Sequence, residues 1–259
     1  MTGSWLDLNG AKIYYEEQGS GTPIVLVHGG LTSSARWAPT VPSLADAFRV
    51  ITPDSRGHGN SDNPSGELSY PQLADDVAAL IAELGLVRPI VGGYSDGGQV
   101  TLEFGVRHPG VARGLVVGAA YPDFARSGIR DINAAFIGAD AAGNPDLGVL
   151  DANLGSYAAA ARSRHPGGEA QWRALVEQSA RMWLDYPGLT PTQIGTIDMP
   201  TLVFAGDRDE MLSLDLVVTL YRMLPNAELA VCPQADHFAV LSNRQDAFAA
   251  AVRDFALRV

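Results

Sequence analysis

The sequence predicts an α/β fold in which a mostly parallel central sheet is flanked by helices and carries a small helical cap insertion. Three observations support this prediction. Short apolar runs alternate with longer amphipathic stretches along most of the chain, a pattern typical of strands that alternate with helices. Most of these runs are apolar without interruption, as expected for strands covered on both faces. The alternation stops between residues 121 and 196, where no strand-like run of β-branched residues occurs.

Eight segments are expected to form the strands. The second alternates between polar and apolar residues and is expected to pair with the first as an antiparallel edge. Most of the others predict parallel strands in the interior of the sheet. In chain order, the segments are Trp5–Leu8, Lys12–Gln18, Ile24–Val27, Arg49–Thr52, Pro89–Gly93, Leu115–Val117, Thr201–Phe204 and Glu228–Val231.

The clearest helix lies between the fourth and fifth of these strands, where apolar residues recur at helical spacing. The apolar positions are Leu73, Val77, Leu80, Ile81 and Leu84. Ser69 and Gln72 fit a capping box at the start of this helix, and Gly85 supplies its end. Two further helices are expected over Gln99–Arg107 and Arg244–Leu257.

The segment between residues 121 and 196 predicts a helical cap over the sheet. It contains an alanine-rich stretch, Tyr157–Arg162, and a helix-like run, Trp172–Tyr186, separated by glycine and proline. The core pattern resumes near Pro200. We therefore expect a core formed by residues 1–120 and 197–259 and a cap formed by residues 121–196.

Composition limits the classes of partner. Eighteen Lys and Arg against 29 Asp and Glu give a net charge of −11, whereas nucleic acids and anionic membranes are bound through basic patches. The single cysteine, Cys232, provides neither an internal disulfide nor a cysteine-based zinc site. No apolar run approaches the roughly 18 residues that span a bilayer, and no secretory signal is evident. We expect a cytoplasmic monomer or homodimer that binds a small molecule, with no nucleic-acid or membrane partner.

A candidate nucleophile lies between the fifth strand and the helix after it. The segment Gly93-Tyr94-Ser95-Asp96-Gly97 matches the pattern G-x-S-x-G in the strand–turn–helix context that this pattern requires. Such a sharp turn exposes the serine hydroxyl at a helix N-terminus, where backbone N–H groups favour a developing oxyanion. Ser95 is therefore the predicted nucleophile.

The candidate general base and the candidate orienting acid lie in the loops after the last two predicted strands. His237 lies between the last strand and the last helix, which places it at the same edge of the sheet as Ser95. Asp209 is the preferred orienting acid, because Asp207 falls within the tight turn itself. Asp236, next to the histidine, and Asp123, after the Leu115–Val117 strand, are the other candidates.

The loop after the third strand is expected to complete the site. A backbone N–H from Gly30, or alternatively from Leu31, would bind the oxyanion together with the N–H of Asp96. The Asp96 side chain adds a carboxylate beside the nucleophile. It either favours a cationic or amine-bearing substrate or is simply held by the helix N-terminus.

These motifs together resemble the α/β-hydrolase fold superfamily, in its group of small single-domain serine hydrolases. The resemblance covers essentially the whole chain. The matching blocks are Pro23–Gly30, Pro53–Asp62, Gly92–Gly98, and Leu202–Asp209 with Asp236-His237. It implies a helical cap at residues 121–196.

The expected function is hydrolysis of a carboxylic ester, lactone or thioester of a small, largely apolar substrate through an acyl-enzyme on Ser95. No metal or organic cofactor is implied. Leu31, Phe124 and Trp183 are the expected substrate-binding residues, because pockets at domain junctions are mainly apolar. Two other functions are possible on this scaffold: a C–C bond hydrolase, lyase or cofactor-free oxygenase, and a non-catalytic small-molecule receptor.

Overall fold

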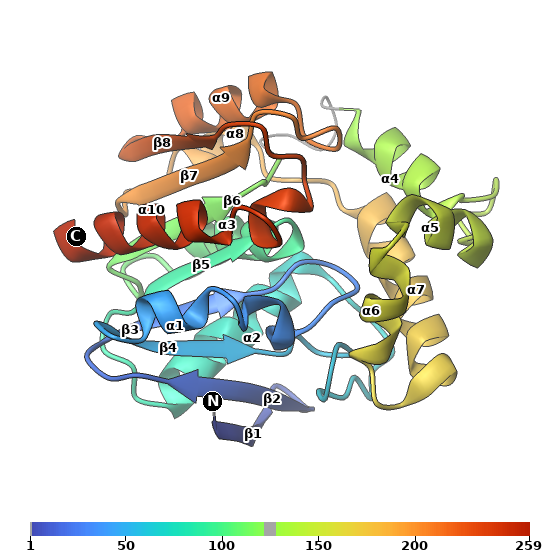
Figure 1. The fold of residues 1–259 in the computed structure, drawn as a ribbon, viewed down its shortest axis with the longest axis horizontal. Helices are drawn as coiled ribbons and strands as arrows, with labels where there is room; N and C mark the ends of the chain where they lie inside the picture. The colour runs from blue at the N-terminus through green and yellow to red at the C-terminus, as the bar shows by residue number, and fades with distance from the viewer. Residues whose placement is uncertain (1, 122–127) are drawn as a thin grey trace.

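The computed structural model describes residues 2–121 and 128–259. Two residues singled out from the sequence, Asp123 and Phe124, lie outside the described residues. The described strands form one sheet in the order β1-β2-β4-β3-β5-β6-β7-β8, flanked by helices (Figure 1). The fold is therefore α/β with a mostly parallel sheet, as predicted.

The strands confirm the eight predicted segments. The first two pair antiparallel, β2 pairs antiparallel with β4, and all other neighbours are parallel. The continuous apolar runs are buried on both faces, as residues 24–27 illustrate with at most 1% exposure. The strands are β1 (Thr2–Leu8), β2 (Ala11–Gln18), β3 (Thr22–Val27), β4 (Phe48–Pro53), β5 (Ile90–Tyr94), β6 (Gly114–Gly118), β7 (Thr201–Gly206) and β8 (Ala227–Cys232).

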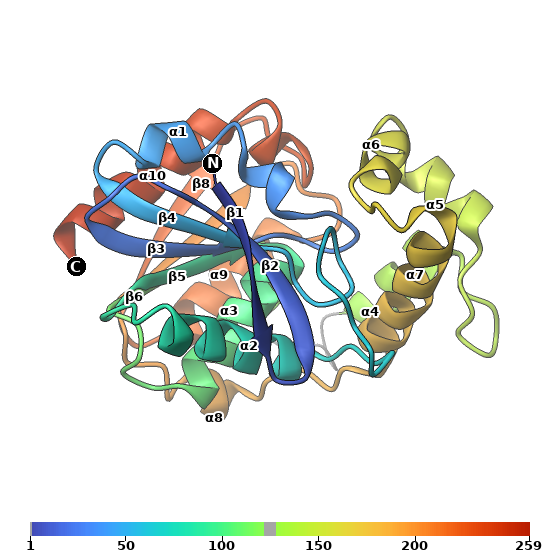
Figure 2. The same cartoon turned by 90° about the horizontal axis from the view of Figure 1, so that it is seen from below.

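Helices cover both faces of the sheet (Figure 2). The short α1 (Val41–Leu44) lies with the C-terminal α10 (Gln245–Arg258) on one face, and α2 (Tyr70–Glu83) lies with α3 (Asp96–Arg107) on the other. The helix α9 (Leu214–Met223) packs on β7 and β8.

The clearest predicted helix, α2, begins where its cap was expected. The Ser69 hydroxyl accepts the N–H of Gln72 at 3.3 Å, which is one half of the predicted capping box. The chain leaves the helix at Gly85 with φ of 58°, a conformation that glycine adopts without strain. The predicted α3 starts three residues earlier than expected, at Asp96.

Four helices between β6 and β7 lie together to one side of the sheet, on the right in Figures 1 and 2. They are α4 (Ile129–Ile137), α5 (Leu147–Leu154), α6 (Tyr157–Ser163) and α7 (Gly168–Asp185). The helix α8 (Pro191–Ile194), which also falls within the predicted insertion, instead packs against α3. The described residues also include two 3-10 helices, η1 (Ser34–Trp37) and η2 (Ala239–Leu241).

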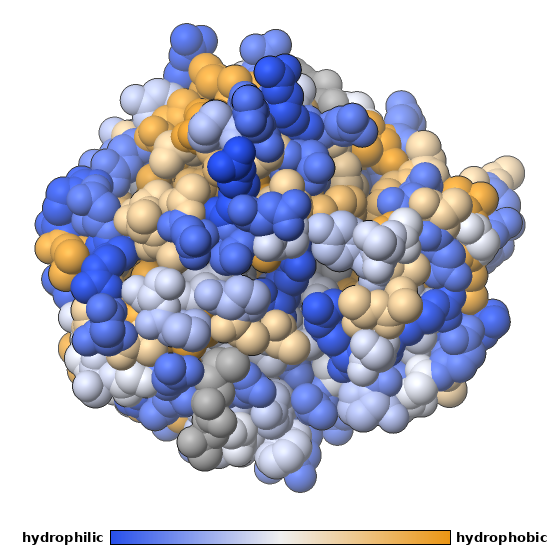
Figure 3. All heavy atoms as spheres, in the orientation of Figure 1, coloured by the Kyte–Doolittle hydropathy of each residue, from blue (hydrophilic) through white to orange (hydrophobic). Residues whose placement is uncertain are grey.

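The surface mixes polar and apolar residues. On the face shown in Figure 3, hydrophilic and hydrophobic residues are interspersed. Within residues 2–121 and 128–259, no helix is long and apolar enough to cross a membrane.

Candidate active site

The turn between β5 and α3 presents Ser95 in a strained conformation. Its φ of 60° and ψ of −123° lie in a region that residues other than glycine rarely adopt. Glycines on either side make the turn possible. A Cβ on Gly93 would collide with the backbone of Gly97, and one on Gly97 would collide with the carbonyl oxygen of Val27. The sheet, the turn and the helix can therefore approach one another closely only with glycine at these positions.

A continuous chain of hydrogen bonds links Ser95 to His237 and Asp209. The Ser95 Oγ lies 2.9 Å from His237 Nε2, and His237 Nδ1 lies 2.7 Å from Asp209 Oδ2. Because a carboxylate only accepts, Nδ1 carries the imidazole proton and Nε2 is free to accept from the serine hydroxyl. The three residues follow the carboxyl ends of β5, β7 and β8, which meet at one edge of the sheet.

Asp209 is held by the backbone in the orientation that reaches the histidine. Its Oδ1 accepts the N–H groups of Met211 at 3.0 Å and Leu212 at 2.8 Å, which leaves Oδ2 for the imidazole. Both Asp209 and His237 are buried, at 8% and 7% exposure. The carboxylate is therefore fixed before any substrate arrives.

The other described candidate acids have different partners. Asp207 Oδ1 accepts the N–H of Ala235 at 3.3 Å. Asp236 Oδ1 accepts the N–H groups of Phe238 and Ala239 at 2.9 Å and 2.7 Å. Both carboxylates stabilise turns of the backbone. Asp209 is the one that the structure brings to the imidazole.

The loop after β3 lies against the nucleophile. A Cβ built on Gly29 would lie 3.3 Å from the Cβ of Ser95, so the loop backbone passes directly beside the serine. A Cβ on Gly30 would collide with the Asp96 carboxylate and the Trp183 ring. The structure thus places Gly29 against Ser95 and Gly30 against Asp96, the residue after the nucleophile.

The Asp96 carboxylate is bound by side chains from two other helices. It accepts the Tyr70 hydroxyl at 2.8 Å and the Trp183 indole N–H at 2.9 Å and 3.1 Å. Burial raises the pKa of Asp96, and the two hydrogen bonds oppose that rise. These side-chain donors, from α2 and α7, were not foreseen in the sequence, which suggested the helix N-terminus or a cationic substrate as the partner.

Two small cavities meet at Ser95 and His237. The first, of about 80 Å³, includes Arg36, Tyr157 and Arg164, and we call it the arginine cavity. The second, of about 60 Å³, includes the predicted residue Trp183, and we call it the tryptophan cavity. Six residues line both: Gly30, Leu31, Ser95, Leu154, His237 and Phe238. The cavities therefore extend from the same hydrogen-bonded pair.

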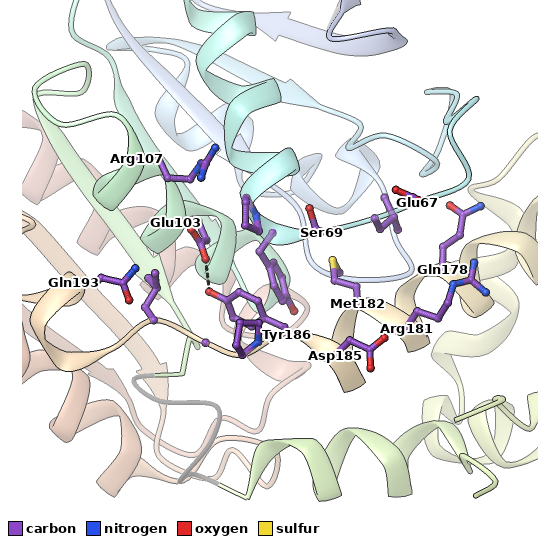
Figure 4. A pocket seen from close by; sticks show the side chains of 16 residues that line it. Glu67, Ser69, Glu103, Arg107, Gln178, Arg181, Met182, Asp185, Tyr186 and Gln193 are labelled. Carbon is purple, nitrogen blue, oxygen red and sulfur yellow. Dashed lines mark hydrogen bonds between the residues drawn. The ribbon is translucent and has the colours of Figure 1, made fainter. Parts of the chain in front are cut away.

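A larger cavity of about 540 Å³ lies elsewhere, between α7 and the start of α2. In Figure 4, Gln178, Arg181 and Asp185 of α7 lie along it, and Tyr186 donates to Glu103 of α3. Ser95 does not line this cavity. Tyr70 lines it and also lines the tryptophan cavity, so that one aromatic side chain borders both spaces.

Three other histidines form a cluster of rings at the loop after β3, namely His28, His58 and His165. By contrast, His108 lies at the far end of α3 and pairs with Asp75. His28 Nδ1 donates to the carbonyl of Gly29 at 2.7 Å, and His28 Nε2 accepts the N–H of Ser55 at 3.0 Å. Its ring centroid lies 5.0 Å from that of His58, which lies 6.3 Å from that of His165. In the part of the chain that the structure describes, no group of three or more His, Cys, Asp or Glu residues could hold a metal ion.

The fold agrees with the comparisons to known proteins. The model of the alpha/beta hydrolase family matches residues 24–251, and the chain belongs to this family. The protein is therefore a hydrolase of the α/β class.

Individual relatives differ in activity. A 2-hydroxymuconate semialdehyde hydrolase from Pseudomonas sp. (strain CF600) is 27% identical over 262 residues, which cover 95% of this chain and 90% of the relative. A non-heme haloperoxidase from Rhodococcus erythropolis is 29% identical over 88% of this chain and 90% of its own length. A meta-cleavage product hydrolase from Pseudomonas fluorescens IP01 has the same fold, with a TM-score of 0.81 at 22% identity over 98% of this chain and 97% of its own.

Proposed function

We propose that the protein is a serine hydrolase that cleaves a carboxylic ester, lactone or thioester through an acyl-enzyme on Ser95. The observation that carries this proposal is the chain of two short hydrogen bonds from Ser95 through His237 to Asp209. A serine hydroxyl is a weak nucleophile unless a base is positioned to remove its proton. The strained turn and the buried acid provide this arrangement without substrate.

In the first half of the reaction, Ser95 Oγ attacks the carbonyl carbon while His237 Nε2 takes its proton. The C–O or C–S bond of the leaving group then breaks, and the imidazolium returns the proton to the departing oxygen or sulfur. Asp209 holds the imidazole in the required tautomer and stabilises its charged form. The product of this half is an ester between the acyl group and Ser95.

In the second half, water replaces the alcohol or thiol. His237 takes a proton from water as the water oxygen attacks the acyl carbon, and then protonates the departing Ser95 Oγ. The N–H groups of Asp96 and Gly30, with Leu31 as the alternative to Gly30, donate to the negatively charged oxygen in both halves. The overall reaction consumes one water and releases an acid and an alcohol or thiol from an ester or thioester, and a single hydroxy acid from a lactone.

The helices α4–α7 act in this proposal as a cap that selects the substrate. Leu154 of α5, Tyr157 of α6 and Trp183 of α7 line the cavities at Ser95. The two cavities of about 80 and 60 Å³ suit small groups on either side of the reacting carbonyl. The cap therefore sets specificity and the triad sets chemistry.

Covalent labelling tests the proposal directly. A small fluorophosphonate should add one phosphonyl group to the protein, detected by intact-mass spectrometry, and the adduct should map to Ser95. The Ser95→Ala protein is the matched control and should remain unlabelled. An unmodified wild-type protein, or an adduct on another residue, would contradict the proposed nucleophile.

A second candidate function is C–C bond hydrolysis. It is favoured by the relative named 2-hydroxymuconate semialdehyde hydrolase, which matches 95% of this chain. Acid quenching during turnover of an ester, followed by mass spectrometry of Ser95, distinguishes the two. An acyl-enzyme supports ester hydrolysis, whereas turnover of only a carbon–carbon substrate favours the alternative. A protein that binds but turns over neither substrate would be a receptor.

A further inference from the structure

Two arginines lie in the arginine cavity with the nucleophile and base. Arg36 comes from η1 of the core, and Arg164 comes from the end of α6. The Arg36 guanidinium donates to the carbonyl of Phe238 at 2.9 Å and lies 5.4 Å from the centroid of the Tyr157 ring. Arg36 is therefore fixed beside the loop that carries His237.

Neither arginine has a carboxylate partner among residues 2–121 and 128–259. This is unusual in a chain with 29 acidic and 18 basic residues. Arg162, two positions away on α6, shows the ordinary arrangement, because it pairs with Asp151 at 2.8 Å and Glu169 at 2.7 Å. The two cavity arginines thus present positive charge that no carboxylate of the described residues pairs with.

Two guanidinium groups that share a partly buried cavity are electrostatically unfavourable unless an anion lies near them. Burial lowers the pKa of both guanidinium groups, and the charge of Arg36 further lowers the pKa of Arg164. Each group nevertheless keeps its charge, because a guanidinium is not deprotonated in proteins. A negatively charged group between them would relieve both the desolvation and the mutual repulsion.

The cavity also offers further hydrogen-bond donors. An arginine has five N–H donors in a planar fork, and Arg36 donates one of them to the carbonyl oxygen of Phe238. Thr32 lines the same cavity, and its buried hydroxyl has no hydrogen-bond partner among the described residues. Two guanidinium groups and a hydroxyl suit the oxygens of a carboxylate.

We propose that Arg36 and Arg164 bind a carboxylate carried by the substrate, so that the enzyme acts on anionic esters, lactones or thioesters. This inference rests on the proposed hydrolase function. The tryptophan cavity, which also borders Ser95, is lined by Phe136, Trp183 and Met211, and its carboxyl group, that of Asp96, offers an anion no donor because it is itself an acceptor. The carboxylate therefore lies in the arginine cavity, and the neutral end of the substrate lies in the tryptophan cavity.

Two matched pairs of substrates test this assignment. Monomethyl adipate and methyl heptanoate compare a carboxylate with an ethyl group, which has one heavy atom fewer, on the acyl half. The ion 4-acetoxybutanoate and pentyl acetate make the same comparison on the alcohol half. We expect a higher kcat/KM for the anionic member of at least one pair, and the ratio should fall when salt is added, because salt screens the attraction.

Substitution of the arginines should remove this preference. Arg36→Met and Arg164→Met should each lower the ratio of kcat/KM for anionic over neutral substrate by about 30-fold, which corresponds to about 2 kcal/mol. Arg173→Met is the matched control, since it removes one charge from a cap arginine that lies outside both cavities and pairs with Glu169. Arg36→Lys should restore only part of the preference, because lysine lacks the planar fork.

The outcomes separate this inference from the proposed function. If fluorophosphonate labels Ser95 but no preference for an anion exists, the carboxylate site is wrong and the hydrolase stands. If Ser95 is not labelled, calorimetric titration of the Ser95→Ala protein with monomethyl adipate and 4-acetoxybutanoate still tests the site. Saturable binding that Arg164→Met abolishes supports it, and the absence of binding overturns it. Melting temperatures of all variants identify any that fail to fold.

Discussion

Replacing Asp209 by asparagine is the most demanding test of the proposed triad, because it changes one charge and one proton while preserving shape. The carboxylate uses Oδ1 for two backbone N–H groups, at 3.0 Å and 2.8 Å, and Oδ2 for His237 at 2.7 Å. In Asp209→Asn, the amide oxygen can keep both backbone bonds. The amide NH₂ group must then face His237.

The substitution changes which nitrogen of the imidazole carries the proton. An NH₂ group cannot accept the Nδ1 proton, so the imidazole adopts the tautomer with its proton on Nε2. That proton points at Ser95 Oγ, 2.9 Å away, and the base can no longer take the serine proton. By analogy with other triads, kcat should fall by about 10⁴, or about 5.4 kcal/mol of transition-state stabilisation.

The assay compares kcat on a neutral ester and the rate of fluorophosphonate labelling for wild type, Asp209→Asn and Asp207→Asn. The Asp207 carboxylate accepts the N–H of Ala235 at 3.3 Å and lies 3.7 Å from the Arg208 guanidinium, away from His237, so its substitution should change kcat by less than about threefold. Urea denaturation should show that the unfolding free energy of Asp209→Asn lies within about 1 kcal/mol of wild type. Retention of more than about a tenth of kcat in Asp209→Asn would refute the reasoning.

Three further predictions concern a buried ion pair, a buried histidine and the tryptophan of the cap. Arg56→Met leaves the buried Asp76 carboxylate without its two 2.6 Å bonds and should cost about 3–5 kcal/mol in urea denaturation, whereas Arg107→Met breaks an exposed pair and should cost at most about 1 kcal/mol. Burial holds the pKa of His58 well below 6.5, so the unfolded chain binds the extra proton. The unfolding free energy should therefore fall as pH drops below about 6.5, by up to about 1.4 kcal/mol per pH unit for this residue, and His58→Leu should flatten that slope. Trp183→Ala should change kcat/KM unequally across a substrate series; equal losses that follow a lower melting temperature would make the tryptophan purely structural.

The sheet could be predicted because its signal is local. Several parallel strands are five or six residues long and largely apolar, namely β3, β5 and β7, and such runs are expected where a strand is buried on both faces of the sheet. The helix α9 was not predicted, although its apolar residues gather on one face, from which Val217 and Leu220 are buried. The early start of α3 was missed because Gly97 and Gly98 disfavour helices, although the tight turn requires small residues there.

The residues of the candidate site that directly follow a strand could be predicted from the sequence. Ser95 and His237 follow strand ends that the pattern located, and parallel strands bring such ends together. The sequence favours Asp209 over Asp207 because Asp207 falls within the tight turn, and Asp209 is the acid that lies 2.7 Å from His237 Nδ1. The hydrogen bond from Arg36 to Phe238 joins residues 202 positions apart, and no local pattern encodes it.

The role of a charged residue depends on the groups that it contacts in the folded protein, as Asp96, Arg36 and Arg164 illustrate. The sequence directs attention to Asp96, since a carboxylate beside a nucleophile suggests a cationic substrate. In the structure that carboxylate already accepts two side-chain donors, whereas Arg36 and Arg164 have no acidic partner among the described residues. Net charge is a poor guide as well, because salt screens distant acids beyond about 8 Å while two arginines inside the cavity act at contact. A protein with a net charge of −11 can therefore favour an anion at its proposed active site, since the charges that decide selectivity are those left unpaired beside the reacting atoms.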